Sequence, residues 1–123
     1  MKFASQITFI YYKDLAEPSK FYEEIFGFEL EIDQGWAKMY RVSESSYLGI
    51  VEETRGHFNW EPKKTALITF VTDSIDEVDE WYQKLKRHGV KILSEPKTHE
   101  DIGVRGFFLQ DPAGYSIEIQ YFL

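Results

Sequence analysis

The sequence contains no cysteine, and none of its apolar stretches approaches the roughly 20 residues that a membrane-spanning helix needs. Without cysteine there is no disulfide, no thiolate metal ligand and no cysteine nucleophile, so a metal site would need His, Asp or Glu. The longest apolar stretch covers residues 7–12, and Ser5 and Gln6 stand where the apolar part of a secretion signal would lie. We therefore expect a cytoplasmic protein with no membrane partner.

Positive charge is also scarce. Fourteen Lys and Arg residues stand against 21 Asp and Glu residues, which gives a formal net charge of −7. Such a chain repels phosphate backbones, so we expect no nucleic-acid partner. No phosphate-binding loop, dinucleotide fingerprint or Ser-His-Asp triad is present.

Aromatic residues are abundant instead, at 17% of the 123 residues. They could fill a core or line a pocket for a flat, apolar ligand. A hydrophobic share of 43% with 28% charged residues is typical of a single globular domain.

The first half of the chain predicts a strand, a helix and three more strands. Residues 3–12 are rich in β-branched and aromatic types, as strands are. Pro18 suits a first helical turn, and Gly27 ends an apolar stripe at helical spacing. Further strands are predicted over residues 28–32, 37–42 and 47–52.

A polar connection over residues 54–64 separates this first module, about residues 1–53, from a second one, about residues 65–123. In the second module Ser74 and Glu77 have the spacing of a helix capping box, and Gly89 ends the helix. Strands are predicted on either side of this helix, over residues 66–71, 90–93, 104–110 and 115–121.

The two halves share landmarks at an offset of about 60 residues, which indicates an internal duplication. Each half has an Asp after its first strand, an aromatic–Tyr pair in its helix and a Gly at the helix end: Asp14, Phe21, Tyr22 and Gly27, then Asp73, Trp81, Tyr82 and Gly89. Both halves therefore predict the order βαβββ, and together they predict one α+β domain.

The chain resembles the vicinal oxygen chelate superfamily over nearly its whole length. This is the family of glyoxalase I, bleomycin-resistance proteins, fosfomycin-resistance enzymes and extradiol dioxygenases. The most specific signal is residues 107–119, Phe-Phe-Leu-Gln-Asp-Pro-Ala-Gly-Tyr-Ser-Ile-Glu-Ile, which look like the family's closing aromatic-Asp-Pro-x-Gly-x-x-Ile/Leu-Glu motif. The resemblance implies two tandem βαβββ modules that form a curved mixed sheet around a cleft.

Metal-dependent members of this family carry one ligand, His, Gln or Glu, on each of four strands. The resemblance places these positions on Ile7, about Gly49, Leu67 and Glu118. Only Glu118 could bind a metal, and one carboxylate with water holds a divalent ion weakly. We therefore expect a metal-free member with no cofactor.

Strand alternation predicts which residues accompany Glu118 in the cleft. Ser116 and Gln120 share its face. If the turn pairs Gln110 with Tyr115, then Phe107 lies opposite Glu118 and Arg105 lies opposite Gln120. Arg105 would then either neutralise Glu118 or bind a polar ligand together with it.

The other predicted cleft residues are mostly apolar, as in small-molecule sites. The inner faces of the strands are expected to carry Ile7, Leu67, Thr69 and Val51 or Tyr47. Three aromatic residues beside the connections are candidates for a pocket rim or a subunit contact, namely Trp36, Phe58 and Trp60.

Three functions remain open at this point. The first is a small-molecule binding protein that sequesters a ligand in the cleft, like bleomycin-resistance proteins. The second is an enzyme of lyase, isomerase, epimerase or dioxygenase type that uses Glu118 as a base or as an unconventional metal ligand. The third is an accessory or regulatory domain that acts through a dimer surface. We expect a homodimer in each case, with residues 54–64 near the subunit contact and the modules paired within one chain or exchanged between two.

Overall fold

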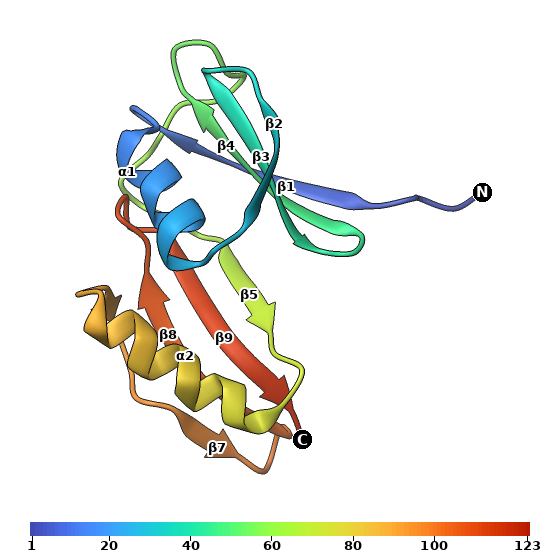
Figure 1. Ribbon diagram of the computed structural model, residues 1–123, viewed down its shortest axis with the longest axis vertical. Helices are drawn as coiled ribbons and strands as arrows, with labels where there is room; N and C mark the ends of the chain where they lie inside the picture. The colour runs from blue at the N-terminus through green and yellow to red at the C-terminus, as the bar shows by residue number, and fades with distance from the viewer. The chain divides into compact units, whose positions relative to one another are not determined.

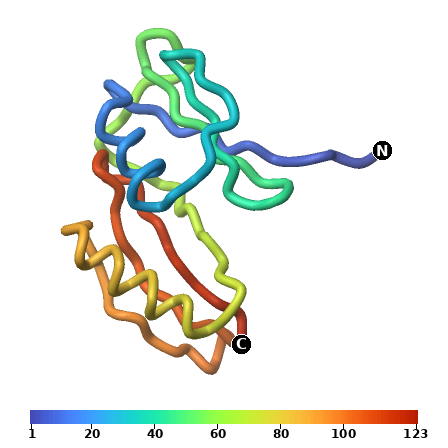
Figure 2. The backbone as a smooth tube through the Cα atoms, viewed as in Figure 1, coloured from blue at the N-terminus to red at the C-terminus, as the bar shows by residue number.

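The computed structural model describes all 123 residues and divides into two compact units, Met1–Pro62 and Lys63–Leu123. Each unit has its own sheet, which Figure 1 shows as ribbons and Figure 2 as a continuous backbone tube. The first unit has the order βαβββ, and the second has the same order with one additional short strand. The fold is therefore mixed α+β, as the sequence predicts. Neither helix is long and apolar enough to cross a membrane.

The N-terminal unit, Met1–Pro62, consists of a helical segment and a four-stranded sheet in the order β1-β4-β3-β2. Strand β1 runs parallel to β4, and the other neighbours are antiparallel. The helix α1 continues directly into the π-helical segment η1, and Gly27 then turns the chain with a φ of 72°. The elements are β1 (Gln6–Tyr12), α1 (Ala16–Lys20), η1 (Phe21–Ile25), β2 (Glu29–Asp33), β3 (Ala37–Ser43) and β4 (Ser46–Glu52).

The helical segment covers one face of this sheet. The Tyr22 ring lies 6.3 Å from the ring of Tyr40 on β3, and the hydroxyl of Tyr12 on β1 donates to that of Tyr22 at 3.4 Å. Ile10 on β1 and Leu48 and Ile50 on β4 are also buried and complete the core of this unit.

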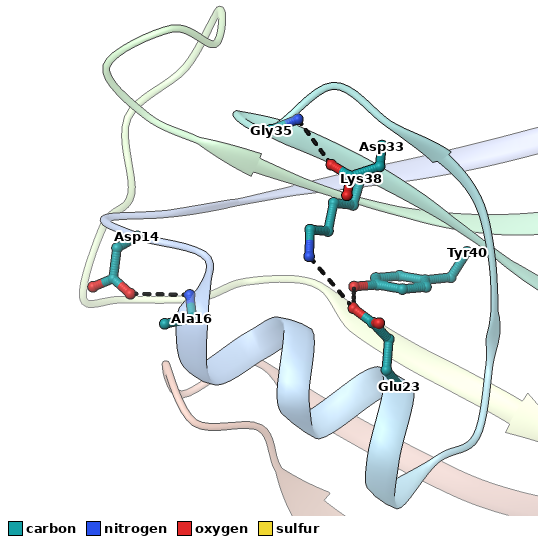
Figure 3. A network of polar contacts seen from close by, with 7 residues as sticks. All are labelled: Asp14, Ala16, Glu23, Asp33, Gly35, Lys38 and Tyr40. Atoms are coloured by element: carbon teal, nitrogen blue, oxygen red, sulfur yellow. Dashed lines mark hydrogen bonds and ion pairs between the residues drawn. The ribbon is translucent and has the colours of Figure 1, made fainter.

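A polar network fixes the helical segment on this face (Figure 3). The Tyr40 hydroxyl donates to Glu23 Oε2 at 2.7 Å, and Lys38 Nζ lies 3.5 Å from the same oxygen. Burial and the Glu23 carboxylate raise the pKa of Tyr40 far above its ordinary value, so its hydroxyl stays a donor. Asp14 and Asp33 cap the loops by accepting hydrogen bonds from the N–H groups two residues ahead (Figure 3).

The C-terminal unit, Lys63–Leu123, has its strands in the order β5-β9-β8-β6, with β7 also paired to β8. The helix α2 packs on β8 and β9 (Figure 1). Ser74 caps α2, because its hydroxyl accepts the Glu77 N–H at 3.4 Å and donates to the Glu77 carboxylate at 3.0 Å, as the capping-box spacing predicts. The elements are β5 (Leu67–Val71), α2 (Ile75–Arg87), β6 (Lys91–Ile92), β7 (Lys97–His99), β8 (Val104–Gln110) and β9 (Ser116–Phe122).

The predicted register between β8 and β9 is wrong by one residue. Gln110 pairs with Ser116 and not with Tyr115. The reason is an Asx turn, in which Asp111 Oδ1 accepts the N–H groups of Ala113 and Tyr115 at 3.0 and 2.9 Å, so that Tyr115 belongs to the turn. A slip of one residue moves every side chain of β8 to the opposite face.

Candidate functional site

The helix-free face of the N-terminal sheet carries alternate residues of β1, β4 and β3. Ile7 pairs with Tyr47, Phe9 with Gly49, and Tyr11 with Val51. Of the residues predicted on inner faces, Ile7 is therefore in register with Tyr47, and Val51 lies further along the same face. Ile7 and Phe9 are 38% and 49% exposed, so this face presents large apolar side chains to solvent.

Two aromatic rings on this face lie directly over glycines. A Cβ atom on Gly49 would lie 2.2 Å from Phe9 Cδ1, and one on Gly56 would lie 2.6 Å from Tyr11 Cε2. No real Cβ atom approaches a ring so closely, so both glycines are required by the rings that cover them. The Phe9 ring thus takes the space into which any side chain at position 49 would extend.

These rings border a hollow of about 290 Å³ that lies wholly within the N-terminal unit. Its lining is mainly apolar and aromatic, with three polar side chains, and consists of Phe9, Tyr11, Gln34, Trp36, Ala37, Val51, Arg55, Gly56 and His57. A second hollow of about 190 Å³ shares Phe9, Gln34 and Ala37 with the first and extends toward Ile7 and Met39.

The segment after β4 forms one wall of the first hollow. It folds back because the N–H groups of Arg55 and Gly56 donate to the Glu52 carbonyl at 3.2 and 3.0 Å. The Glu52 N–H in turn donates to the Trp36 carbonyl at 2.8 Å. Trp36, a candidate for a pocket rim or a subunit contact, lines the hollow, and the Arg55 guanidinium lies over its ring at 5.3 Å from the ring centre.

Six lining side chains were not predicted as site residues: Phe9, Tyr11, Gln34, Ala37, Arg55 and His57. The alternation of Phe9 and Tyr11 on β1 was the available signal, because both share the face of Ile7. The return of the segment after β4 to this face depends on hydrogen bonds that the sequence does not indicate.

The open face of the C-terminal sheet holds the acidic residue that the family motif singles out. Thr69 pairs with Glu118, and its hydroxyl donates to Glu118 Oε1 at 2.9 Å. With its amide nitrogen turned toward the carboxylate, Gln120 donates to Glu118 Oε2 at 3.1 Å. Leu67 lies on the same face, so four of the predicted site residues, Leu67, Thr69, Glu118 and Gln120, share one face of this sheet.

Arg105 and Phe107 do not lie on this face, contrary to the prediction. The shifted register turns both toward α2, where Phe107 is fully buried with its ring edge on to that of Tyr82. Arg105 donates to both carboxylate oxygens of Asp79, at 2.7 and 3.0 Å, and this pairing lowers the pKa of Asp79. The predicted partnership of Arg105 with Glu118 is therefore wrong, and Glu118 has no cationic partner.

The residues at the four metal-ligand positions that the family resemblance implies do not fit a divalent metal. Ile7 and Leu67 have no donor atoms, Gly49 has no side chain, and only Glu118 offers a carboxylate. The Phe9 ring also covers Gly49, so a neighbouring side chain cannot supply a ligand there without displacing that ring. Nowhere in the chain do three or more His, Asp or Glu side chains gather in a metal-binding arrangement.

Known protein structures share this fold. A lactoylglutathione lyase from Agrobacterium tumefaciens superposes with a TM-score of 0.77 at 22% identity, over 96% of this chain and 92% of that one. The fosfomycin resistance protein FosX from Listeria monocytogenes superposes with a TM-score of 0.78 at 20% identity, over 100% of this chain and 96% of that one. At these identities the likeness shows the fold alone.

No curated protein sequence gives a significant match to this chain. A family model, in contrast, matches residues 5–119, which is nearly the whole sequence. The chain therefore belongs to the Glyoxalase/Bleomycin resistance protein/Dioxygenase superfamily.

Proposed function

We propose that this protein binds a small, planar, largely apolar molecule in the hollow of its N-terminal unit and sequesters it without a metal. The observation that carries the proposal is the hollow itself, with Phe9, Tyr11 and Trp36 in its lining. Aromatic side chains with a few polar groups are the usual lining of small-molecule sites. A volume of about 290 Å³ suits a ligand of one or two fused rings.

The positions of the two glycines support a formed site. Gly49 and Gly56 let the rings of Phe9 and Tyr11 lie close to the backbone, where a side chain at either position would push them away. A preformed apolar surface avoids the entropy loss of ordering side chains when the ligand binds. The family name includes bleomycin resistance proteins, and one structural relative is named as a fosfomycin resistance protein, which fits a role in sequestering a toxic small molecule.

Isothermal titration calorimetry tests this proposal, because it detects binding without relying on the fluorescence of Trp36, which lies in the hollow. A panel of planar one-ring and two-ring compounds is titrated into the unchanged protein, Trp36→Ala and the control Trp81→Phe, whose substitution lies on α2 of the other unit. We expect saturable binding of at least one compound to the unchanged protein and the control, and a loss of binding in Trp36→Ala. If no compound binds, or if binding survives in Trp36→Ala, the proposal is wrong.

A second candidate function is proton transfer by Glu118. It is favoured by one observation, the carboxylate on the open face of the C-terminal sheet, which accepts hydrogen bonds from Thr69 and Gln120 but has no ion pair. Such a carboxylate can take a proton from a weakly acidic C–H group held above it. This function predicts deuterium incorporation into a carbonyl compound in heavy water, detected by NMR, and its loss in Glu118→Gln. Binding in the hollow without such exchange in any compound argues for sequestration.

A further inference from the structure

The charge around the hollow is opposite in sign to that of the whole chain. Arg55 is the only lining side chain with a fixed charge, and no Asp or Glu is among the lining residues. The chain as a whole carries 21 acidic residues against 14 basic ones. A positive group beside an apolar hollow, in a chain of formal charge −7, therefore needs an explanation of its own.

Arg55 has no carboxylate partner within the protein. Of the three other arginines, Arg41 is paired with Glu31 and Arg105 with Asp79, at 2.6 and 2.7 Å. No ion pair involves Arg55, and its guanidinium instead lies over the Trp36 ring. Stacking on an aromatic face leaves the N–H groups at the guanidinium edge available, and these groups match the two oxygens of a carboxylate.

The backbone holds Arg55 in place at the hollow. Its N–H and that of Gly56 both donate hydrogen bonds to the Glu52 carbonyl, and the Glu52 N–H donates to the Trp36 carbonyl. The guanidinium stacks on the ring of the same Trp36. The backbone segments that carry the cation and the aromatic ring are thus both hydrogen-bonded to Glu52. A guanidinium held in this way loses less side-chain entropy when it binds an anion.

We infer that the ligand of the hollow is a planar aromatic carboxylate, whose ring lies against Phe9, Tyr11 and Trp36 and whose carboxylate pairs with Arg55. This inference rests on the proposed function and adds the ligand class. The net charge of −7 opposes anions only at long range, since physiological salt screens exposed charges beyond about 8 Å. A monoanion suits the site better than a dianion, because the negative chain repels a ligand of charge −2 twice as strongly as one of charge −1.

The test uses three probes that share one ring system and differ in charge, namely 2-naphthoate, 2-naphthamide and 2-naphthylmethylammonium. Their affinities are measured by isothermal titration calorimetry for the unchanged protein, Arg55→Gln, Arg55→Lys and the control Arg87→Gln, which changes an exposed arginine at the end of α2. We expect the unchanged protein to bind naphthoate about tenfold or more tightly than naphthamide, as a charge-assisted hydrogen-bonded pair gives.

Arg55→Gln should remove this preference by weakening the binding of naphthoate far more than that of naphthamide. Arg55→Lys should keep part of the preference, and Arg87→Gln should keep it in full. Equal affinity for naphthoate and naphthamide, or a preference for the ammonium probe, would overturn the carboxylate inference and leave the proposed function standing, provided that Trp36→Ala abolishes the binding. If none of the three probes binds, the inference and the proposed function both fail.

Discussion

The contact between Phe9 and Gly49 yields a prediction about stability. Gly49→Ala should destabilise the protein when Phe9 is present and stabilise it when Phe9 is replaced by alanine. In Gly49→Ala the new Cβ would lie 2.2 Å from Phe9 Cδ1 and 2.4 Å from Cε1, whereas ordinary contacts begin at 3.4 Å. The ring must therefore leave the backbone that it covers. Because Phe9 is half exposed, the ring can swing toward solvent, and the protein should still fold.

Two opposing terms set the expected magnitude. Overpacking of a well-packed position costs roughly 1–3 kcal/mol, and the freedom of the ring to move places Gly49→Ala near the lower end. Replacing a strand glycine by alanine recovers about 0.5–1 kcal/mol of backbone entropy. We therefore expect Gly49→Ala to lower the free energy of unfolding by about 1 kcal/mol when Phe9 is present. In a Phe9→Ala background the clash is gone, and the same substitution should raise the free energy of unfolding by about 0.5 kcal/mol.

A double-mutant cycle in urea, followed by circular dichroism, measures this coupling. The expected interaction energy is about 1.5 kcal/mol, within the range found for residues in contact. Phe108→Ala serves as the matched control, because Phe108 is also a partly exposed aromatic residue, on β8 of the other unit. Gly49→Ala should stay destabilising in that background. A stabilising effect of Gly49→Ala in the unchanged protein, or equal effects with and without Phe9, would refute the reasoning.

Four further predictions concern other parts of the chain. Tyr40→Phe removes the hydrogen bond to Glu23 and should lower the free energy of unfolding by about 1 kcal/mol in urea titrations. Because Arg105 holds the pKa of Asp79 below its ordinary value of 3.8, the ionised pair stabilises the fold above that pH and loses its effect as the pH falls through the lower folded-state pKa. Asp79→Asn should therefore cost at most about 1 kcal/mol at neutral pH, since Asp79 is half exposed, and this difference should shrink as the pH drops below 3.8. Metal analysis of protein purified without chelator should find no stoichiometric zinc, nickel, iron or manganese, because the four family positions offer one carboxylate. We also propose a homodimer, and light scattering at micromolar concentration should give twice the 14.6 kDa mass of one chain.

The duplicated βαβββ order was predictable because its signals are local. Helix ends at Gly27 and Gly89 need a positive φ, which the structure has at 72° and 71°. The capping pair Ser74 and Glu77 forms as its spacing predicts. Strand alternation assigned Ile7, Val51 or Tyr47, Thr69 and Glu118 to inner faces. The structure pairs Ile7 with Tyr47 and Thr69 with Glu118, because parallel neighbours in one sheet keep their faces once the register is set.

The partner of Arg105 was not predictable, because it depends on one extra turn residue. The Asx turn at Asp111 moves the β8 register by a single position, and this alone decides whether Arg105 faces Glu118 or α2. Sequence patterns identify the turn residues but not the pairing that the turn imposes. The short strand β7 was missed for a related reason, since Lys97–His99 is polar and forms only by pairing with β8.

The hollow was only partly predictable. Trp36 was a candidate rim residue because it lies beside a connection, and the alternation of Phe9 and Tyr11 was visible on β1. The contribution of Arg55 depends on backbone hydrogen bonds that fold the segment after β4 back toward Trp36. Such a return of a polar loop has no periodic signal in the sequence.

One measurement tests the central claim most directly, that the ligand site is the aromatic hollow beside Arg55. The ¹⁵N-labelled protein is titrated with 2-naphthoate and followed by two-dimensional NMR of its N–H groups. The largest shifts are expected at the Trp36 indole N–H, the backbone of Gly56 and the Arg55 side chain, all of which border the hollow. Shifts concentrated at Thr69, Glu118 and Gln120, or no saturable shift at all, would contradict the account.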